Sequence, residues 1–265
     1  MELRVKCPKP FSLAVTVDCG QSFRFKVDGN EVSGIVNKKL IRVRQTEDEL
    51  VFYNITKEEY DDFFCDYFDL CRDYEKINET IGKEEPLKTI VESEKGIRIL
   101  NQDPFETLIS FIISQNNNIP RIKGIIERLC ENFGEEIEGG FAFPAVEKLA
   151  SLSAEDLAVL RAGFRARYIV DAAHKVASGK VDLYSLKDKS LEDAEAELQK
   201  IVGVGKKVAD CTLLFSCRHL DAFPEDVWIK RAVKELFNNG MPKYVEPYRG
   251  IAQQYIFNYY RKLHN

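Results

Sequence analysis

Two adjacent lysines follow a glycine-rich turn in the stretch IVGVGKKVADC, residues 201–211. Gly203 and Gly205 permit positive φ and a close approach of two helices. The amides at the start of the second helix form an anion site suited to a phosphate. A helix–turn–helix corner without any function explains the glycines equally well. The two lysines favour a functional site, because the helix macrodipole makes the start of a helix an unfavourable place for cations.

Lys207 is the better candidate for a nucleophile. A lysine amine attacks only when neutral, and only about one in a thousand is neutral near pH 7.5. A helix N-terminus, a neighbouring cation and partial burial all favour the neutral amine, and the sequence supplies the first two. Lys206 has Asp210 at i+4, which predicts a surface ion pair. Lys207 has Cys211 and Leu214 at i+4 and i+7, so it lies along an apolar stripe.

Asp226 is the candidate carboxylate partner. It follows Pro224 at the expected start of a helix, in AFPEDVWIKRAV, residues 222–233. Its simplest role is that of an N-cap, whose side chain accepts a hydrogen bond from the first turn. Beside a lysine nucleophile, a carboxylate can also stabilise a developing cation or move protons.

The elements that position these groups read as helical from residue 56 onward. Asp103, Pro104 and Glu106 predict a helix start with an N-cap, a first-turn proline and a capping box. The helix that follows is apolar nearly all round, so we expect it to be buried. Further helices are expected near residues 119–133, 165–176, 191–201, 206–216, 226–237 and 248–263.

The first third of the chain reads as β. We expect strands at FSLAVTV (11–17), SFRFKV (22–27), EVSGIV (31–36), LIRVRQ (40–45) and ELVFYN (49–54), with a hairpin turn at Asp28–Asn30. The fold class is therefore α+β, an N-terminal antiparallel sheet followed by a helical body. We divide the chain into residues 1–95, the sheet with flanking helices, and residues 96–265, an all-helical domain.

Composition restricts the possible partners and ligands. The net charge is −5, but residues 46–95 hold 16 acidic and 6 basic side chains (−10), so the remainder carries +5. This asymmetry permits a basic working surface despite the acidic total. The seven cysteines form no CxxC and the three histidines lie far apart in the sequence, so the sequence does not indicate a zinc or iron–sulfur site. No signal-type segment and no membrane-length apolar run is present, so we expect a cytosolic protein with reduced thiols.

These residues resemble the helix-hairpin-helix DNA glycosylase superfamily, which is named for its glycine/proline-rich loop and aspartate. GVGKKVADC together with PEDVW is similar to the 8-oxoguanine DNA glycosylases in particular. Four more blocks match that family in order: GQSFRF (20–25), QDPFETLISFIISQNNNIPRI (102–122), GFRARY (163–168) and GIAQQYIF (250–257). The resemblance covers nearly the whole chain. It implies that the helical body is a glycosylase domain carrying the active site and the DNA-binding hairpin.

The resemblance also implies a reaction. Family members flip 8-oxoguanine out of the duplex and excise it. By similarity, Lys207 attacks the sugar C1′, displaces the base and forms a Schiff base, after which β-elimination cleaves the strand. Asp226 assists this chemistry and caps its helix.

The same resemblance assigns the base pocket to four residues. The Gly20 carbonyl accepts a hydrogen bond from the N7–H of the oxidised base and repels the N7 acceptor of guanine. Cys211 and Phe257 sandwich the flipped base, and Gln253 reads its Watson–Crick edge. From the residues alone, Gly20 is a strand-entry bend and Phe257 a core aromatic.

Contacts to the duplex are implied for residues outside this pocket. Asn116 enters the gap left by the flipped base, and Arg121 and Arg165 hold the orphaned cytosine. Phe164 is the wedge, where eukaryotic members have tyrosine. The hairpin glycines bring backbone amides to a phosphate. Trp228 replaces a phosphate-contacting histidine of the eukaryotic members.

The expected partner is double-stranded DNA containing 8-oxoguanine, preferably opposite cytosine, bound by a monomer at the nucleoid of a prokaryotic cytosol. No metal takes part in catalysis, although the resemblance allows a monovalent cation between hairpin carbonyls and a phosphate. Two alternatives stay open. One is a superfamily glycosylase for another damaged base, which Lys207 argues against because the monofunctional relatives lack it. The other is a non-catalytic DNA-binding module.

Overall fold

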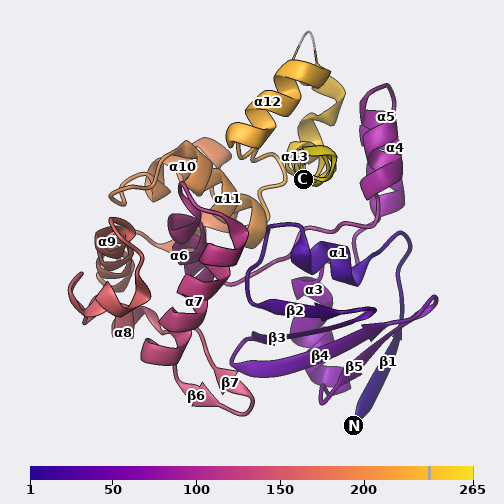
Figure 1. The fold of residues 1–265 in the computed structure, drawn as a ribbon. Helices are drawn as coiled ribbons and strands as arrows, with labels where there is room; N and C mark the ends of the chain where they lie inside the picture. Colours follow the sequence, from indigo (N-terminus) through magenta and orange to yellow (C-terminus); the bar gives the residue numbers. More distant parts are fainter. Residues whose placement is uncertain (238–239, 265) are drawn as a thin grey trace.

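The computed structural model describes residues 1–237 and 240–264. Its N-terminal part is a five-stranded antiparallel sheet with the order β1-β5-β4-β3-β2 (Figure 1). The strands are β1 (Glu2–Lys6), β2 (Phe25–Asp28), β3 (Glu31–Val36), β4 (Lys39–Gln45) and β5 (Glu49–Tyr53). The expected turn is confirmed, since Asp28 pairs with Glu31 across the β2–β3 hairpin.

Two features of the sheet differ from the sequence-based expectation. The segment FSLAVTV is not a strand but contains α1 (Leu13–Asp18), whose buried residues Leu13, Thr16 and Val17 have helical spacing. The Leu13 amide donates to Gln45 Oε1 at 2.7 Å, so a tertiary contact fixes the start of this helix. Strand β1 was not expected, because exposed charged side chains alternate in it with only two partly buried apolar ones, a pattern found at sheet edges.

The rest of the chain is mainly helical. The helices are α2 (Lys57–Glu59), α3 (Cys65–Tyr67), α4 (Tyr74–Ile81), α5 (Leu87–Glu94), α6 (Pro104–Ser114), α7 (Ile119–Phe133), α8 (Val146–Ala150), α9 (Arg165–Ala177), α10 (Leu191–Leu198), α11 (Lys206–Ser216), α12 (Val227–Leu236) and α13 (Arg249–His264), with a small hairpin of β6 (Glu136–Ile137) and β7 (Gly140–Phe141). The six later helices expected from the sequence are all found, with ends shifted by three residues at most.

Helix α6 lies at the centre of the helical body and is buried from Phe105 to Ile113, as its all-round apolar sequence predicts. Asp103 caps it by accepting from the Glu106 amide at 2.8 Å. The expected capping box was wrong, because the Glu106 carboxylate pairs instead with Arg24 at 3.3 Å. This ion pair ties α6 to the segment that enters the sheet.

Two hydrophobic cores hold the molecule together. One joins the sheet to α1, α3 and their neighbours, and the other runs through the helical body. Helices α4 and α5 contribute Tyr74, Ile77, Ile90 and other side chains to the helical core, and both lie beside α13 (Figure 1). The division of the chain at residue 95 remains a prediction. Within the described ranges, no helix combines the length and apolar character needed to cross a bilayer.

Candidate active site

A cavity of about 560 Å³ opens where the helical body meets the segment that follows α1. Its walls come from this segment, from the start of α7, from α6, α11 and α13, and from the loop before α12. All six residues predicted to be catalytic or to contact the base line it: Gly20, Lys207, Cys211, Asp226, Gln253 and Phe257. The fold therefore brings together groups that are up to 237 positions apart in the chain.

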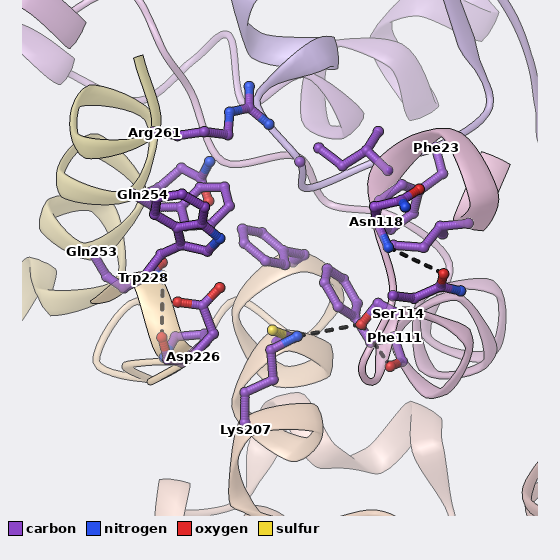
Figure 2. Close-up of a pocket in the computed structure, with 18 of the residues that line it drawn as sticks. Phe23, Phe111, Ser114, Asn118, Lys207, Asp226, Trp228, Gln253, Gln254 and Arg261 are labelled. Atoms are coloured by element: carbon purple, nitrogen blue, oxygen red, sulfur yellow. Dashed lines mark hydrogen bonds between the residues drawn. The ribbon is translucent and has the colours of Figure 1, made fainter. Parts of the chain in front are cut away.

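Lys207 reaches the cavity from the first turn of α11 (Figure 2). Its Nζ donates to Ser114 Oγ at 3.3 Å and lies 5.1 Å from the centre of the Phe111 ring. Cys211 lines the cavity one turn further along α11, and burial raises the pKa of its thiol to about 11 against the opposing effect of Lys207. The thiol is therefore neutral at physiological pH, and the amine is the nucleophile that this wall offers.

Lys206 has a different environment. It forms ion pairs with Glu195 at 2.6 Å and Asp210 at 3.1 Å. The predicted i+4 pair is thus present, but it is not a surface pair, because Asp210 is buried. Partial burial lowers the pKa of Lys206, but the bonds to Glu195 and Asp210 outweigh this effect and raise it. Lys206 thus stays cationic next to Lys207, and its link to Glu195 joins α11 to α10.

Asp226 caps α12, as predicted, by accepting a hydrogen bond from the Ile229 amide to its Oδ1 at 2.8 Å. Its carboxylate lines the same cavity as the Lys207 amine, and both side chains point into it in Figure 2. Within residues 1–237 and 240–264, its Oδ2 accepts no hydrogen bond. One oxygen is therefore used for structure, and the other faces the cavity.

The wall opposite the nucleophile is made by Gly20 and Phe257. Gly20 has φ +91°, and a Cβ there would lie 3.1 Å from Phe257 Cε1. The backbone at Gly20 therefore lies directly against the ring, and this conformation favours glycine. Sequence reasoning alone had favoured a simple bend at this position, and the structure places that bend in the cavity wall.

Gln253 presents an unsatisfied acceptor. Its Nε2 donates to the Pro224 carbonyl at 3.1 Å, whereas its buried Oε1 has no hydrogen-bond partner among the described residues. Because an unpaired buried acceptor is costly, the arrangement suits a ligand that donates a hydrogen bond.

Four predicted DNA contacts lie outside the cavity. Asn116 and Arg121 are exposed, and Phe164 is 43% exposed at the start of α9. Arg165 is buried, and its Nη2 and Nη1 donate to the carbonyls of Asn116 and Ala162, each at 3.0 Å. In this structure Arg165 thus holds the loop that presents Asn116. Its contact with an orphaned cytosine stays a prediction.

The two hairpin glycines differ. Gly203 has φ +81°, so the positive φ allowed for it is confirmed. A Cβ there would lie 2.4 Å from the Tyr168 ring, so the close neighbour is a side chain of α9; the close backbone approach of two helices stays a prediction. Gly205 has φ −96°, so the positive φ allowed for it is not used. No atom lies within 4 Å of its Cβ position, and no side chain caps α11 among the described residues. The first amides of α11 are therefore accessible to an anion.

Several cavity residues were missed from the sequence alone. Phe111 and Phe215 stack at 5.4 Å beneath the lysine, and Ser114 binds its amine. Gln254 and Arg261 lie on α13 (Figure 2). Their signal was present as an i, i+3, i+7 set with Phe257 on one helix, but only the tertiary contacts show which side of the helix faces the cavity. Trp228, which the sequence did single out, lines the cavity as well.

The chain is similar to known proteins along most of its length. Residues 4–108 match the family described as 8-oxoguanine DNA glycosylase, N-terminal domain, and residues 109–249 match the HhH-GPD superfamily of base excision DNA repair proteins. An N-glycosylase/DNA lyase of Saccharomyces cerevisiae is 43% identical over 54% of this chain and 42% of its own length. The N-glycosylase/DNA lyase OGG1 of Arabidopsis thaliana is 31% identical over 82% of this chain and 64% of its own length. The chain thus spans less than two thirds of these two curated relatives.

A solved structure matches more completely. The 8-oxoguanine glycosylase/lyase of Clostridium acetobutylicum, in complex with double-stranded DNA containing cytosine opposite 8-oxoguanine, is 38% identical with a TM-score of 0.89. The match covers 96% of this chain and 93% of that one. The chain belongs to the 8-oxoguanine DNA glycosylase family within the HhH-GPD superfamily.

Proposed function

We propose that the protein is a bifunctional DNA glycosylase and lyase that excises 8-oxoguanine from duplex DNA, preferably opposite cytosine. The observation that carries the proposal is the cavity itself. It holds a lysine amine, a carboxylate with one oxygen facing inward, and an unpaired amide acceptor on a neighbouring wall. Nucleophile, charge stabiliser and base reader are the three groups that such a reaction requires.

The reaction follows from these positions. The neutral Lys207 amine attacks C1′ of the flipped nucleotide, the bond from C1′ to the base breaks, and the base leaves with the electron pair. One proton of the attached amine passes to the departing base. The C1′–O4′ bond then breaks, O4′ takes up a proton from solvent, and a protonated Schiff base remains between Nζ and C1′. Loss of a C2′ proton from this Schiff base breaks the C3′–O bond, expels the 3′ phosphate and cleaves the strand. Asp226 stabilises the positive charge that develops on the sugar.

Recognition of the oxidised base uses a difference at N7. Guanine has an acceptor there, whereas 8-oxoguanine has an N7–H donor. A carbonyl at Gly20 accepts from the second and repels the first. Gln253 Oε1, which has no partner among the described residues, accepts from the Watson–Crick edge. The apolar side chains of Cys211 and Phe257 enclose the faces of the base.

The duplex is held by the residues around the cavity. Exposed Phe164 acts as the wedge, Asn116 fills the gap, and Arg121 and Arg165 favour cytosine on the opposite strand. The first amides of α11 bind a phosphate, since no side chain in the described part of the chain caps this helix.

A monovalent cation at the hairpin stays part of this proposal. Among the described residues, the carbonyls of Val202, Gly203 and Val204 accept no backbone hydrogen bond, and oxygen atoms of this kind are available to such an ion. DNA affinity should be higher in potassium chloride than in tetramethylammonium chloride at equal ionic strength. Equal affinities in both salts would exclude the cation.

Borohydride trapping tests the function. The protein is incubated with a duplex that carries one 8-oxoguanine opposite cytosine, beside an undamaged control duplex. We expect a covalent adduct with the wild type and with Lys206→Gln, and none with Lys207→Gln or with undamaged DNA. Lys206→Gln is the matched control because it removes an adjacent charge but not the nucleophile. Binding without any adduct would refute the bifunctional mechanism and leave a monofunctional enzyme or a binding module.

A further inference from the structure

One face of α13 holds the backbone that precedes and includes Gly20. Gln254 Nε2 donates to the Cys19 carbonyl at 2.8 Å, and Arg261 Nη2 donates to the Asp18 carbonyl at 3.3 Å. Between them on the helix, Phe257 packs against Gly20 itself. The three α13 residues are spaced i, i+3 and i+7, so one helix face makes all three contacts.

Among the described residues, one of the four backbone carbonyls from residue 18 to residue 21 accepts no hydrogen bond. The carbonyls of Asp18 and Cys19 are occupied by Arg261 and Gln254, and the Gln21 carbonyl accepts from Gln102 Nε2 at 2.8 Å. Within residues 1–237 and 240–264, the Gly20 carbonyl accepts no hydrogen bond. It is thus the only carbonyl in this row of four without a partner among those residues.

Arg261 also lies close to Phe257 and Gly20, which form one wall of the cavity. Its guanidinium lies 5.6 Å from the centre of the Phe257 ring, and its Nη1 lies 3.8 Å from the position a Gly20 Cβ would occupy. Its second hydrogen bond goes to Asn258 Oδ1 at 3.2 Å. Gln254 is 2% exposed, and among the described residues its side chain makes one hydrogen bond, the bond to the Cys19 carbonyl. Neither side chain takes part in the chemistry proposed for Lys207.

We propose that Gln254 and Arg261 are positioning residues for lesion recognition, because they fix the backbone from which the Gly20 carbonyl meets the base. This inference rests on the proposed function. The carbonyl discriminates one hydrogen from one lone pair at N7, so a small displacement removes the selective contact. Phe257 sits on the same helix face, and the ring and the carbonyl are therefore placed by one element.

Two reactions of the same active site separate positioning from stability. Excision of 8-oxoguanine requires the base pocket, whereas β-elimination at a preformed abasic site uses Lys207 with no base present. Gln254→Met and Arg261→Met remove the donors and keep most of the side-chain volume. Arg42→Met is the matched control, since Arg42 also lies over an aromatic ring, 4.3 Å from the centre of Tyr53, but on the sheet.

We expect single-turnover excision of 8-oxoguanine to fall about tenfold or more in each α13 variant. Cleavage at the abasic site should stay within about twofold of the wild type, which also shows that the variants are folded. Arg261→Lys, which keeps a cationic donor, should recover part of the excision rate. The control should match the wild type in both reactions.

Three outcomes would overturn the inference. Unchanged excision in both variants would show that the Gly20 carbonyl is placed without them. Equal losses in excision and abasic-site cleavage would show a general structural role. A wild-type protein that cleaves abasic sites but never excises 8-oxoguanine would refute the proposed function itself, and this inference with it.

Discussion

Asp226 has two roles that substitution can separate. Its Oδ1 caps α12, and its carboxylate lines the cavity with Lys207. Asparagine caps a helix about as well as aspartate, whereas alanine does not. Asp226→Asn should therefore keep the cap and lose the charge, and Asp226→Ala should lose both.

The two effects have different sizes and different assays. Losing the N-cap costs about 1 kcal/mol, which for a chain of this size lowers the Tm by about 2–4 °C. Losing the carboxylate charge should slow excision of 8-oxoguanine by about 100-fold or more. Asp226→Asn should thus melt within about 1 °C of the wild type and be nearly inactive in single-turnover excision.

A second capping aspartate provides the control. Asp73 caps α4 by accepting from the Lys76 amide at 3.1 Å, and it does not line the cavity. Asp73→Ala should lower the Tm by a similar amount with excision unchanged. If Asp226→Asn excises within about twofold of the wild type, the carboxylate is only a cap and the proposed charge stabilisation is wrong.

Three more predictions follow from single positions. Gly20→Ala places a Cβ on a residue with φ +91° and 3.1 Å from Phe257, so the Tm should fall by about 2–4 °C. Excision should drop at least tenfold while abasic-site cleavage is retained. Full excision would contradict the placement of Gly20 in the wall that meets the base. Phe164→Ala removes a 43% exposed ring, so excision from duplex should fall several-fold at an unchanged Tm, and an unchanged rate would refute the wedge. Burial raises the pKa of Glu106 to about 7, against the opposing effect of Arg24. In the unfolded chain a glutamate loses its proton near pH 4.3. The contribution of Glu106 to stability therefore falls as pH rises from about 4 to 7. Glu106→Gln should make the Tm less dependent on pH over that range. A Tm that changes with pH as steeply as in the wild type would contradict the raised pKa of Glu106.

The sequence predicted the catalytic side of the site better than its recognition side. Lys207 and Asp226 stand at helix starts, where caps, prolines and glycines mark the boundaries clearly. The bend at Gly20 follows a segment whose alternating apolar residues predict a strand, but tertiary contacts to Gln45 make it helical. Local propensity cannot show such an override.

The side chains that complete the cavity could not be predicted from the sequence for a related reason. Ser114 and Phe111 lie on a helix that is apolar nearly all round, so its sequence does not reveal which side meets α11. Arg165 was expected to contact an orphaned cytosine, whereas in this structure it is buried and donates to backbone carbonyls. Glu106 was predicted to complete a capping box, but its carboxylate instead accepts a hydrogen bond from Arg24, which is 82 positions away in the chain.

The hydrogen bond from Gln254 to Cys19 joins residues 235 positions apart. During synthesis the sheet and α6 emerge before α13, so the Lys207 amine is present before Gln253, Phe257 and the side chains that hold the backbone at Gly20. In the reaction proposed above, the base pocket is therefore complete only after α13 has packed against the segment that follows α1. A chain that stops before α13 would carry the amine without the groups proposed to select the base.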